Sequence, residues 1–203
     1  MKTPPTEPVP LVRTAWGFYL LIALAGLLWI GLREDVIPVS LFLDLQTWWI
    51  DLGLGIGSGL VLVGVWRLAV VAVPGARELE ERIAALLGHL SGDEALALAV
   101  LSGIAEELFF RGALQGSWGW IAATLLFALL HTGPGKVFGL WTLFAVVAGG
   151  LFGGLMLWRG NLLAPMLAHF VVNAINLRRL VREAAASRDA AEPETGEDET
   201  TPE

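Results

Sequence analysis

Long apolar runs dominate this sequence, and several of them are long enough to cross a membrane. A helix needs about 20 mainly apolar residues to span the hydrocarbon core of a bilayer. The chain has 203 residues, of which 55% are hydrophobic and only 16% are charged, whereas a soluble domain is roughly a quarter charged. We therefore predict an all-α fold, a polytopic bundle of about six transmembrane helices. The spans cover approximately residues 15–32, 52–73, 95–114, 120–131, 137–158 and 162–177.

One segment between the second and third spans has a different pattern. Over residues 77–90, charged residues alternate with Leu, Ile and Ala at helical spacing, which is typical of an amphipathic helix at the membrane surface. Ser91, followed by Asp93 and Glu94, predicts the start of the next helix. Four glycines in the second span suit close helix packing in lipid, although a poorly packed glycine-rich segment is the alternative. These are Gly53, Gly55, Gly57 and Gly59.

The basic residues in the loops predict the orientation of the spans. Cytoplasmic loops of membrane proteins carry an excess of Lys and Arg. If the N-terminus is cytoplasmic, ten basic residues lie on that side and only Arg33 and Arg159 lie on the other. We therefore expect a multi-pass protein of the cell's inner (plasma) membrane with both termini in the cytoplasm.

Composition also excludes several functions. There is no cysteine, so disulfides, thiolate metal sites and cysteine-protease chemistry are excluded. The net charge of −7 arises in the segment 183–203, which holds eight acidic residues and one Arg. The rest of the chain is neutral and has no basic stripe with interleaved aromatics, so we expect no nucleic-acid partner.

The third span contains three ionisable residues. Charged side chains inside a membrane are costly, and they usually face the bundle interior and mark function. Glu107 and Arg111 are four residues apart in the favourable order for a helical ion pair, whereas Glu106 points about 100° away around the helix. We therefore predict that Glu107 and Arg111 form a structural pair and that Glu106 is free for chemistry. One structural network of all three residues is the alternative.

Two later spans bring further polar groups. His131 ends the fourth span, four residues after Phe127, and on the sixth span His169 and Asn173 are four apart and share a helix face. A single His on an apolar helix is more often a packing residue than a catalytic one. Asn173 could also join helices by a hydrogen bond worth about 1 kcal/mol. Three helices with complementary polar groups nevertheless favour a site between them.

These residues resemble the motifs of a known family. Glu106-Glu107-Leu108-Phe109-Phe110-Arg111 resembles the EExxxR motif of the CAAX protease and bacteriocin-processing (Abi) family of intramembrane proteases. The segments 127–131 and 169–173 resemble its FxxxH and HxxxN motifs, in the same order. The resemblance covers roughly residues 92–177. Some small bacterial members resemble sorting proteases that remove a C-terminal hydrophobic anchor, and this chain has their size.

The resemblance implies a mechanism for each motif residue. It assigns water activation to Glu106 with help from His131, and stabilisation of the oxyanion to His169 and Asn173. Asn and an N–H-donating His are suitable donors for a tetrahedral oxyanion. Glu107, Arg111 and Phe127 are expected to support the site.

A zinc site is the competing interpretation of the same residues. Two histidines and a glutamate can hold zinc with water in the fourth position, and Glu106, His131 and His169 would be the ligands. The spacing does not resemble HExxH, whose histidines sit one turn apart on one helix. We favour a metal-free glutamate mechanism without a cofactor.

Substrates and rival functions follow from this interpretation. We expect membrane lipids and a peptide or membrane-anchored protein substrate as partners, with no prediction of oligomeric state. The substrate is expected to be a bacterial peptide precursor or the C-terminal anchor of a surface protein. A non-catalytic scaffold or bacteriocin-immunity protein is the main rival. A proton-coupled transporter is a second rival, but no internal repeat or pair of broken helices supports it.

The chain is expected to have four parts. Residues 1–14 form a disordered lead, and residues 15–91 form two spans and the amphipathic helix. Residues 92–180 form the catalytic transmembrane core. Residues 181–203, with low complexity and clustered like charge, form a disordered acidic tail.

Overall fold

The computed structural model describes residues 11–87 and 90–190, and over these residues the chain is all-helical without strands. This confirms the predicted fold class. The elements are α1 (Leu11–Glu34), η1 (Val39–Leu41), α2 (Trp48–Ala72), α3 (Pro74–Leu87), α4 (Gly92–Glu107), the π-helical segment η2 (Leu108–Gln115), α5 (Gly116–Leu130), α6 (Phe138–Arg159) and α7 (Leu163–Asp189).

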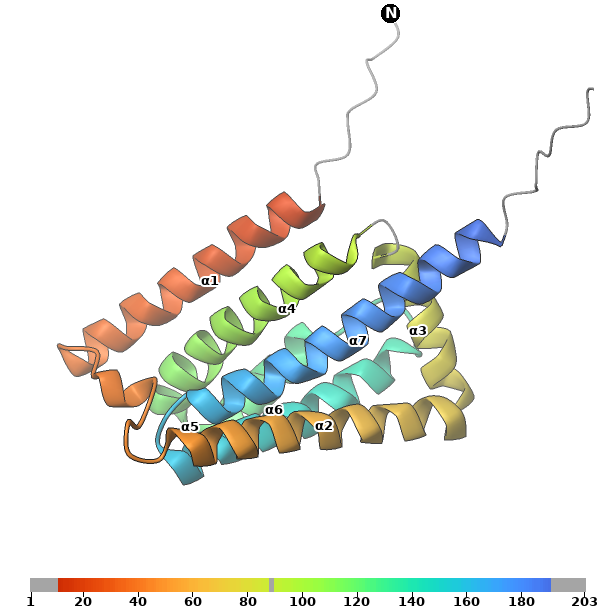
Figure 1. The fold of residues 1–203 in the computed structure, drawn as a ribbon. Helices are drawn as coiled ribbons and strands as arrows, with labels where there is room; N and C mark the ends of the chain where they lie inside the picture. The colour runs from red at the N-terminus through yellow and green to blue at the C-terminus, as the bar shows by residue number, and fades with distance from the viewer. Residues whose placement is uncertain (1–10, 88–89, 191–203) are drawn as a thin grey trace, which may run out of the picture.

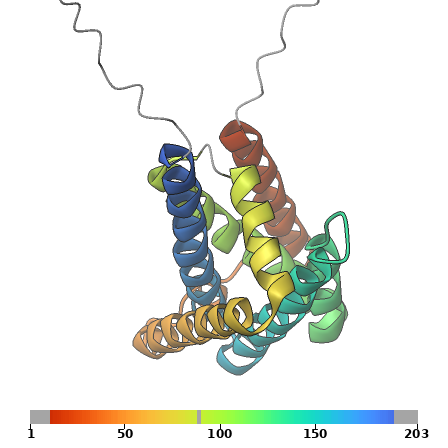
Figure 2. The same ribbon diagram turned by 90° about the vertical axis from the view of Figure 1, so that its right-hand side faces the viewer.

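Most helices run side by side along the length of a bundle (Figure 1). α7 is the central element and has its most extensive contacts with α2 and α4, while α1 packs on α4 and η2. α3 lies across the end of the bundle where α1 begins and α7 ends, as the second view also shows (Figure 2).

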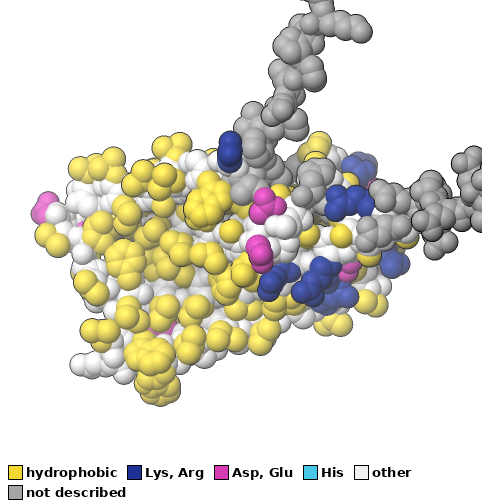
Figure 3. Space-filling model, turned by 45° about the horizontal axis from the view of Figure 1, so that its top comes forward, with side chains coloured by type: hydrophobic (Ala, Val, Ile, Leu, Met, Phe, Trp, Pro, Cys, Tyr) yellow, Lys and Arg dark blue, Asp and Glu magenta, His cyan; other side chains and the backbone are white. Residues whose placement is uncertain are grey.

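The outer surface of the bundle is suited to lipid. Within residues 11–87 and 90–190, four helical stretches are long and apolar enough to cross a membrane: Arg13–Glu34, Trp48–Ala72, Gly92–Leu130 and Phe138–Arg159. Hydrophobic side chains cover much of the face in Figure 3, and basic side chains gather at one end of it. Large apolar residues such as Leu21, Leu68 and Leu129 are more than 60% exposed, which is unusual in a soluble monomer and indicates contact with acyl chains.

The stretch Gly92–Leu130 contains two of the expected spans, because the chain reverses within it. Gly119 adopts φ 85° and ψ 168°, a conformation available to glycine but costly for other residues. α5 therefore folds back on η2, and the rings of Phe110 and Phe127 meet edge to face at 5.2 Å. α7 runs along the bundle as the predicted sixth segment, but it is less apolar because it carries His169, Asn173 and the arginines of its C-terminal half.

Glycines set the distance between α2 and α7. A Cβ atom on Gly55 would lie 2.6 Å from Cβ of Leu167, and one on Gly59 would lie 2.7 Å from Cβ of Val171. Gly53 and Gly57 have open space around them. The predicted close packing is thus confirmed for two of the four glycines, which are spaced as in the small-xxx-small pattern of membrane helix pairs.

Several predicted boundaries need correction. Helix α1 begins at Leu11, so residues 11–14 are not part of a disordered lead, and residues 1–10 lie outside the described range. Helix α7 continues to Asp189, so residues 181–189 are not part of a disordered tail. The extra turns of α7 are stabilised by an i,i+4 ion pair of 2.7 Å between Arg179 and Glu183. The rest of the predicted tail, residues 191–203, lies outside the described range.

A buried polar network connects the helices at the end of the bundle opposite α3. Asp51 is fully buried, and its carboxylate accepts hydrogen bonds from Arg159 at 2.5 Å and from Asn161 at 2.9 Å. Arg159 also donates to Thr47 at 2.6 Å. These bonds connect the start of α2 with the turn between α6 and α7. They therefore fix the position of α2 relative to the end of α6 and the beginning of α7.

Candidate active site

A cavity of about 380 Å³ lies inside the bundle, toward the end covered by α3. Its walls come from all seven α-helices and are mainly apolar, with aromatic side chains from α2, α5 and α6. Most ligand-binding cavities combine such a lining with a few convergent polar groups. The polar residues that line this cavity include Tyr19, Glu80, Ser102, Glu106, His131, His169, Asn173 and Asn176.

Helix α4 carries the first motif into the cavity. It begins as predicted after Ser91, whose hydroxyl accepts from the backbone of Glu94 while the Glu94 carboxylate accepts from the backbone of Ser91. This reciprocal capping satisfies two amide groups that a helix start leaves free. Beyond Glu107 the helix widens into η2. There Arg33 of α1 donates to the carbonyls of Gly112 and Ala113 at 3.1 and 2.9 Å.

Glu107 and Arg111 form the predicted ion pair in the interior. Arg111 Nη1 donates to Glu107 Oε1 at 3.2 Å, and Nε lies 3.2 Å from Oε2. Both side chains are almost completely buried. Arg111 also donates to the carbonyl of Gly149 at 3.1 Å, and its guanidinium lies 4.5 Å from the centre of the Phe127 ring. The pair therefore connects η2 with α5 and α6.

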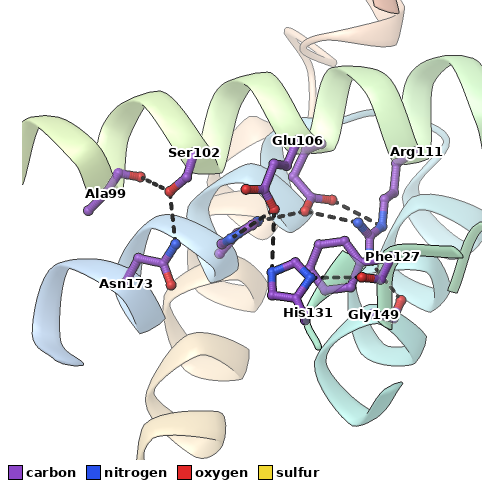
Figure 4. Close-up of polar contacts among 10 residues, drawn as sticks. Ala99, Ser102, Glu106, Arg111, Phe127, His131, Gly149 and Asn173 are labelled. Carbon is purple, nitrogen blue, oxygen red and sulfur yellow. Dashed lines mark hydrogen bonds and ion pairs between the residues drawn. The ribbon is translucent and has the colours of Figure 1, made fainter. Parts of the chain in front are cut away.

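Glu106 faces His131 (Figure 4), and it also faces His169 of α7. Its Oε2 atom lies 3.8 Å from Nε2 of His131 and 3.9 Å from Nε2 of His169. Oε2 is buried and has no hydrogen-bond partner among the residues that the structure describes. Three motifs that are far apart in the sequence thus meet at one carboxylate oxygen.

The other nitrogen of each histidine is fixed by an acceptor. Nδ1 of His131 lies 2.7 Å from the carbonyl oxygen of Phe127, and Nδ1 of His169 lies 2.8 Å from Oε1 of Glu107. A carbonyl or carboxylate oxygen can only accept, so both Nδ1 atoms carry the hydrogen. In a neutral ring, Nε2 then presents its lone pair toward Glu106, and in a protonated ring it presents an N–H.

Aromatic rings hold the two imidazoles in place. The Phe152 ring stacks on His169 with centroids 5.2 Å apart and an interplanar angle of 19°. Phe127 lies 4.3 Å from the His131 ring, and Trp141 meets it edge to face at 5.6 Å. Phe127, expected to support the site, therefore contacts Arg111, His131 and His169 at once.

Asn173 is the one predicted catalytic residue that does not contact this group. It lies one turn beyond His169 on α7, and its Nδ2 donates to Ser102 Oγ at 2.8 Å. Ser102 was not singled out from the sequence, although it lies four residues before Glu106 on the same helix. Tyr19 was also missed, because it belongs to α1, outside the resemblance; it lines the cavity together with Glu106 and Ser102.

A second charged group lies at the α3 side of the cavity. Glu80 is only 7% exposed and accepts a hydrogen bond of 2.8 Å from Trp66 Nε1. It also forms an ion pair with Arg179 of α7. The amphipathic segment was expected to lie at the membrane surface, and in the structure α3 buries Ala76, Leu79 and Glu80 against α2, α6 and α7.

The charges of the buried cluster determine what it can do. It contains two carboxyl groups, Glu106 and Glu107, and one guanidinium, Arg111. With both carboxyl groups ionised its net charge is −1, so one proton on Glu106 or on a histidine makes it neutral. Uncompensated buried charge is costly, and we therefore expect one such proton. A proton that can move between Glu106 and two imidazoles is suited to general acid–base chemistry.

Glu106, His131 and His169 supply the donor atoms that a zinc site would use. A carboxylate and two imidazole nitrogens are suitable ligands, and each Nδ1 has the type of partner that orients metal-binding histidines. Two ligands about 2.1 Å from one tetrahedral zinc lie roughly 3.4 Å apart, which is closer than 3.8 and 3.9 Å. Over residues 11–87 and 90–190, no three His, Cys, Asp or Glu side chains are arranged to hold a metal.

Comparisons with known proteins agree with the motifs. Residues 94–175 match the family model described as type II CAAX prenyl endopeptidase Rce1-like. An uncharacterized protein of Bacillus subtilis (strain 168), YpbD, is 41% identical over 80 residues, which are 38% of this chain and 41% of YpbD. The match therefore spans less than half of that relative. No solved structure matches the chain significantly.

The matched segment contains nearly all of α4, together with η2, α5, α6 and the part of α7 that carries His169 and Asn173. It therefore includes all three motifs and both histidines that face Glu106. Over residues 94–175 the chain is similar to the Rce1-like family of CAAX prenyl endopeptidases, and this similarity agrees with the resemblance inferred from the motifs.

Proposed function

We propose that this protein is an intramembrane endopeptidase that hydrolyses a peptide bond with water activated by Glu106. One observation carries the proposal. The buried Oε2 of Glu106 faces the Nε2 atoms of His131 and His169 at 3.8 and 3.9 Å, inside a mainly apolar cavity. Two atoms that share a water molecule by hydrogen bonds of about 2.8 Å lie roughly 4.6 Å apart at tetrahedral geometry. In the proposed mechanism the gap between Glu106 and His131 therefore widens by somewhat less than about 1 Å when the water binds between them.

The proposed reaction proceeds in two proton-coupled steps. In the first, the water oxygen attacks the carbonyl carbon of the scissile bond while its proton passes to Glu106. The negative charge moves to the carbonyl oxygen, which accepts hydrogen bonds from the protonated ring of His169 and from the amide of Asn173. In the second, the C–N bond breaks and the proton passes from Glu106 to the leaving nitrogen, which regenerates the carboxylate.

Glu107 and Arg111 have a supporting role in this mechanism. Glu107 accepts from Nδ1 of His169, which orients the ring so that Nε2 points into the cavity. Arg111 compensates the buried charge of Glu107. An oxyanion donor is effective only when its direction is fixed before the charge develops, so this pair contributes to catalysis without contact with the substrate.

The proposal extends to the substrate and the cellular location. The apolar cavity suits a hydrophobic peptide segment that reaches it from the membrane. A bacterial peptide precursor or the C-terminal anchor of a surface protein meets this requirement. The basic side chains collected at the α3 end of the bundle favour a cytoplasmic position for that end, with both termini in the cytoplasm and the bundle in the inner membrane.

The experiment that tests this function uses the purified full-length protein in liposomes with a panel of tagged, membrane-anchored bacterial precursor peptides. Mass spectrometry identifies any new terminus. We expect the wild-type protein to cleave at least one peptide at one bond, and Glu106→Ala and His131→Ala to be folded but inactive. Full activity in Glu106→Ala would contradict the catalytic role.

A non-catalytic scaffold or immunity protein is the alternative function. It predicts that Glu106→Ala leaves the cellular function intact, whereas Glu107→Ala or Arg111→Ala disrupts the bundle. The position of Glu106 Oε2 between the Nε2 atoms of His131 and His169 favours the enzyme, because a carboxylate and two imidazoles that converge on one cavity are suited to general acid–base chemistry.

A further inference from the structure

Two pairs of side chains connect α4 with α7 along the cavity wall. Glu107 binds His169, and one turn away Ser102 binds Asn173. Between the pairs the two helices are in close contact, since a Cβ atom on Gly103 would lie 3.1 Å from the backbone nitrogen of Phe170. Both α7 residues with a proposed role at the oxyanion are therefore held by a side chain of α4.

The hydroxyl group of Ser102 acts both as a hydrogen-bond donor and as an acceptor. Its Oγ donates to the carbonyl of Ala99 at 3.3 Å and accepts from Nδ2 of Asn173 at 2.8 Å (Figure 4). Ser102 is only 3% exposed. Its one hydrogen points back along its own helix, so Ser102 is oriented as an acceptor for the amide and not as a proton donor to a substrate.

This bond determines how Asn173 presents its amide to the cavity. The terminal torsion of an Asn side chain has a broad energy profile, so an unrestrained amide would rotate. The bond to Ser102 uses one of the two N–H groups of Nδ2 and fixes the plane of the amide. The second N–H of Asn173 Nδ2 remains available. Asn173 lines the same cavity as Glu106 and His169.

We propose that Ser102 is a positioning residue, which holds the Asn173 amide so that its second N–H can donate to the oxyanion formed at Glu106. This inference rests on the proposed protease function. Ser102 acts through Asn173 and does not touch the substrate. Ser102→Ala should therefore lower kcat, leave KM unchanged, and have no effect when Asn173 is absent.

The test is a double-mutant cycle on the full-length protein in liposomes, with the peptide that the wild-type protein cleaves in the panel above as the probe. Removal of an oxyanion donor lowers kcat by about 10²–10³-fold, so we expect about a 100-fold loss in Asn173→Ala. Ser102→Ala, which only frees the donor, should lose about 10-fold in kcat with KM within twofold. In the Asn173→Ala background, Ser102→Ala should change kcat less than twofold.

The matched control is Ser58→Ala, a half-buried serine on α2 that does not line the cavity, which should retain wild-type kcat. An equal loss from Ser102→Ala with and without Asn173, a change in KM alone, or full activity in Ser102→Ala would each overturn the inference while the protease function stands. Failure of the wild-type protein to cleave any peptide of the panel would overturn both.

Discussion

Nδ1 of His169 lies 2.8 Å from Oε1 of Glu107, so the glutamate that binds Arg111 also holds a histidine of α7. The neighbouring Glu106 faces Nε2 of the same ring at 3.9 Å. Adjacent glutamates therefore face opposite nitrogens of one imidazole, one through a short hydrogen bond and the other at 3.9 Å, beyond hydrogen-bond distance.

The first prediction concerns how much each of these two glutamates contributes to the stability of the fold. Glu107→Gln keeps the shape of the side chain but leaves the Arg111 charge uncompensated in the interior. Loss of one partner of a buried ion pair costs about 3–5 kcal/mol, and we expect the free energy of unfolding in detergent to fall by this amount. Glu106→Gln is the matched control and should unfold at the wild-type temperature or above. Equal destabilisation by both variants would contradict the division of roles.

The second prediction concerns metal. The proposed mechanism moves protons only between water, Glu106 and the leaving nitrogen, so a chelator should not reduce the cleavage rate. Elemental analysis of the purified, active protein should give far less than one zinc ion per chain. Loss of activity with chelator and its recovery on addition of zinc would favour the alternative in which Glu106, His131 and His169 bind the metal.

The third prediction concerns the contact between α2 and α7. Gly59→Ala places a methyl group 2.7 Å from Val171 Cβ and 2.9 Å from the carbonyl oxygen of Ala168, so the helices must separate. We expect a clear fall in the thermal unfolding temperature, since overpacking costs about 1–3 kcal/mol. Gly57→Ala, two residues away and facing open space, should be neutral or slightly stabilising. A similar effect of both substitutions would argue against this helix contact.

The fourth prediction concerns the network at the end opposite the cavity. Asp51→Ala removes the fully buried carboxylate that binds Arg159 and Asn161. The buried Asn161 amide then loses its partner, and we expect a clear fall in the free energy of unfolding. The exposed Asp93, in the first turn of α4, is the control, and Asp93→Ala should cost under about 1 kcal/mol. Detergent unfolding measures both. The activity of the folded fraction of Asp51→Ala should remain close to wild type.

The membrane bundle and the motif residues could be predicted from the sequence, because both depend on local features. Apolar length and i,i+4 spacing follow directly from helix geometry, and the Glu107–Arg111 pair is present as expected. The convergence of His131 and His169 on Glu106 was expected from the family resemblance, since local spacing gives no information on how separate helices meet.

Other features depend on tertiary contacts that no local pattern specifies. Gly55 and Gly57 are alike in sequence, but only Gly55 faces α7. Glu80 belongs to an amphipathic pattern with a charged face, yet the orientation of α3 across the bundle buries it between Trp66 and Arg179. Ser102 is a small residue in an apolar run, and its contact with Asn173 is visible only once α4 and α7 are side by side.

The most direct test of the central claim is the cleavage rate of Glu106→Gln beside that of the wild-type protein, in the same liposomes and with the same peptide. Gln retains the size and hydrogen-bonding capacity of Glu but cannot accept a proton from water. General base catalysis contributes about 10²–10⁴-fold. We predict a loss of kcat of at least about 100-fold with an unchanged unfolding temperature. A rate within threefold of wild type in this folded variant would contradict the account.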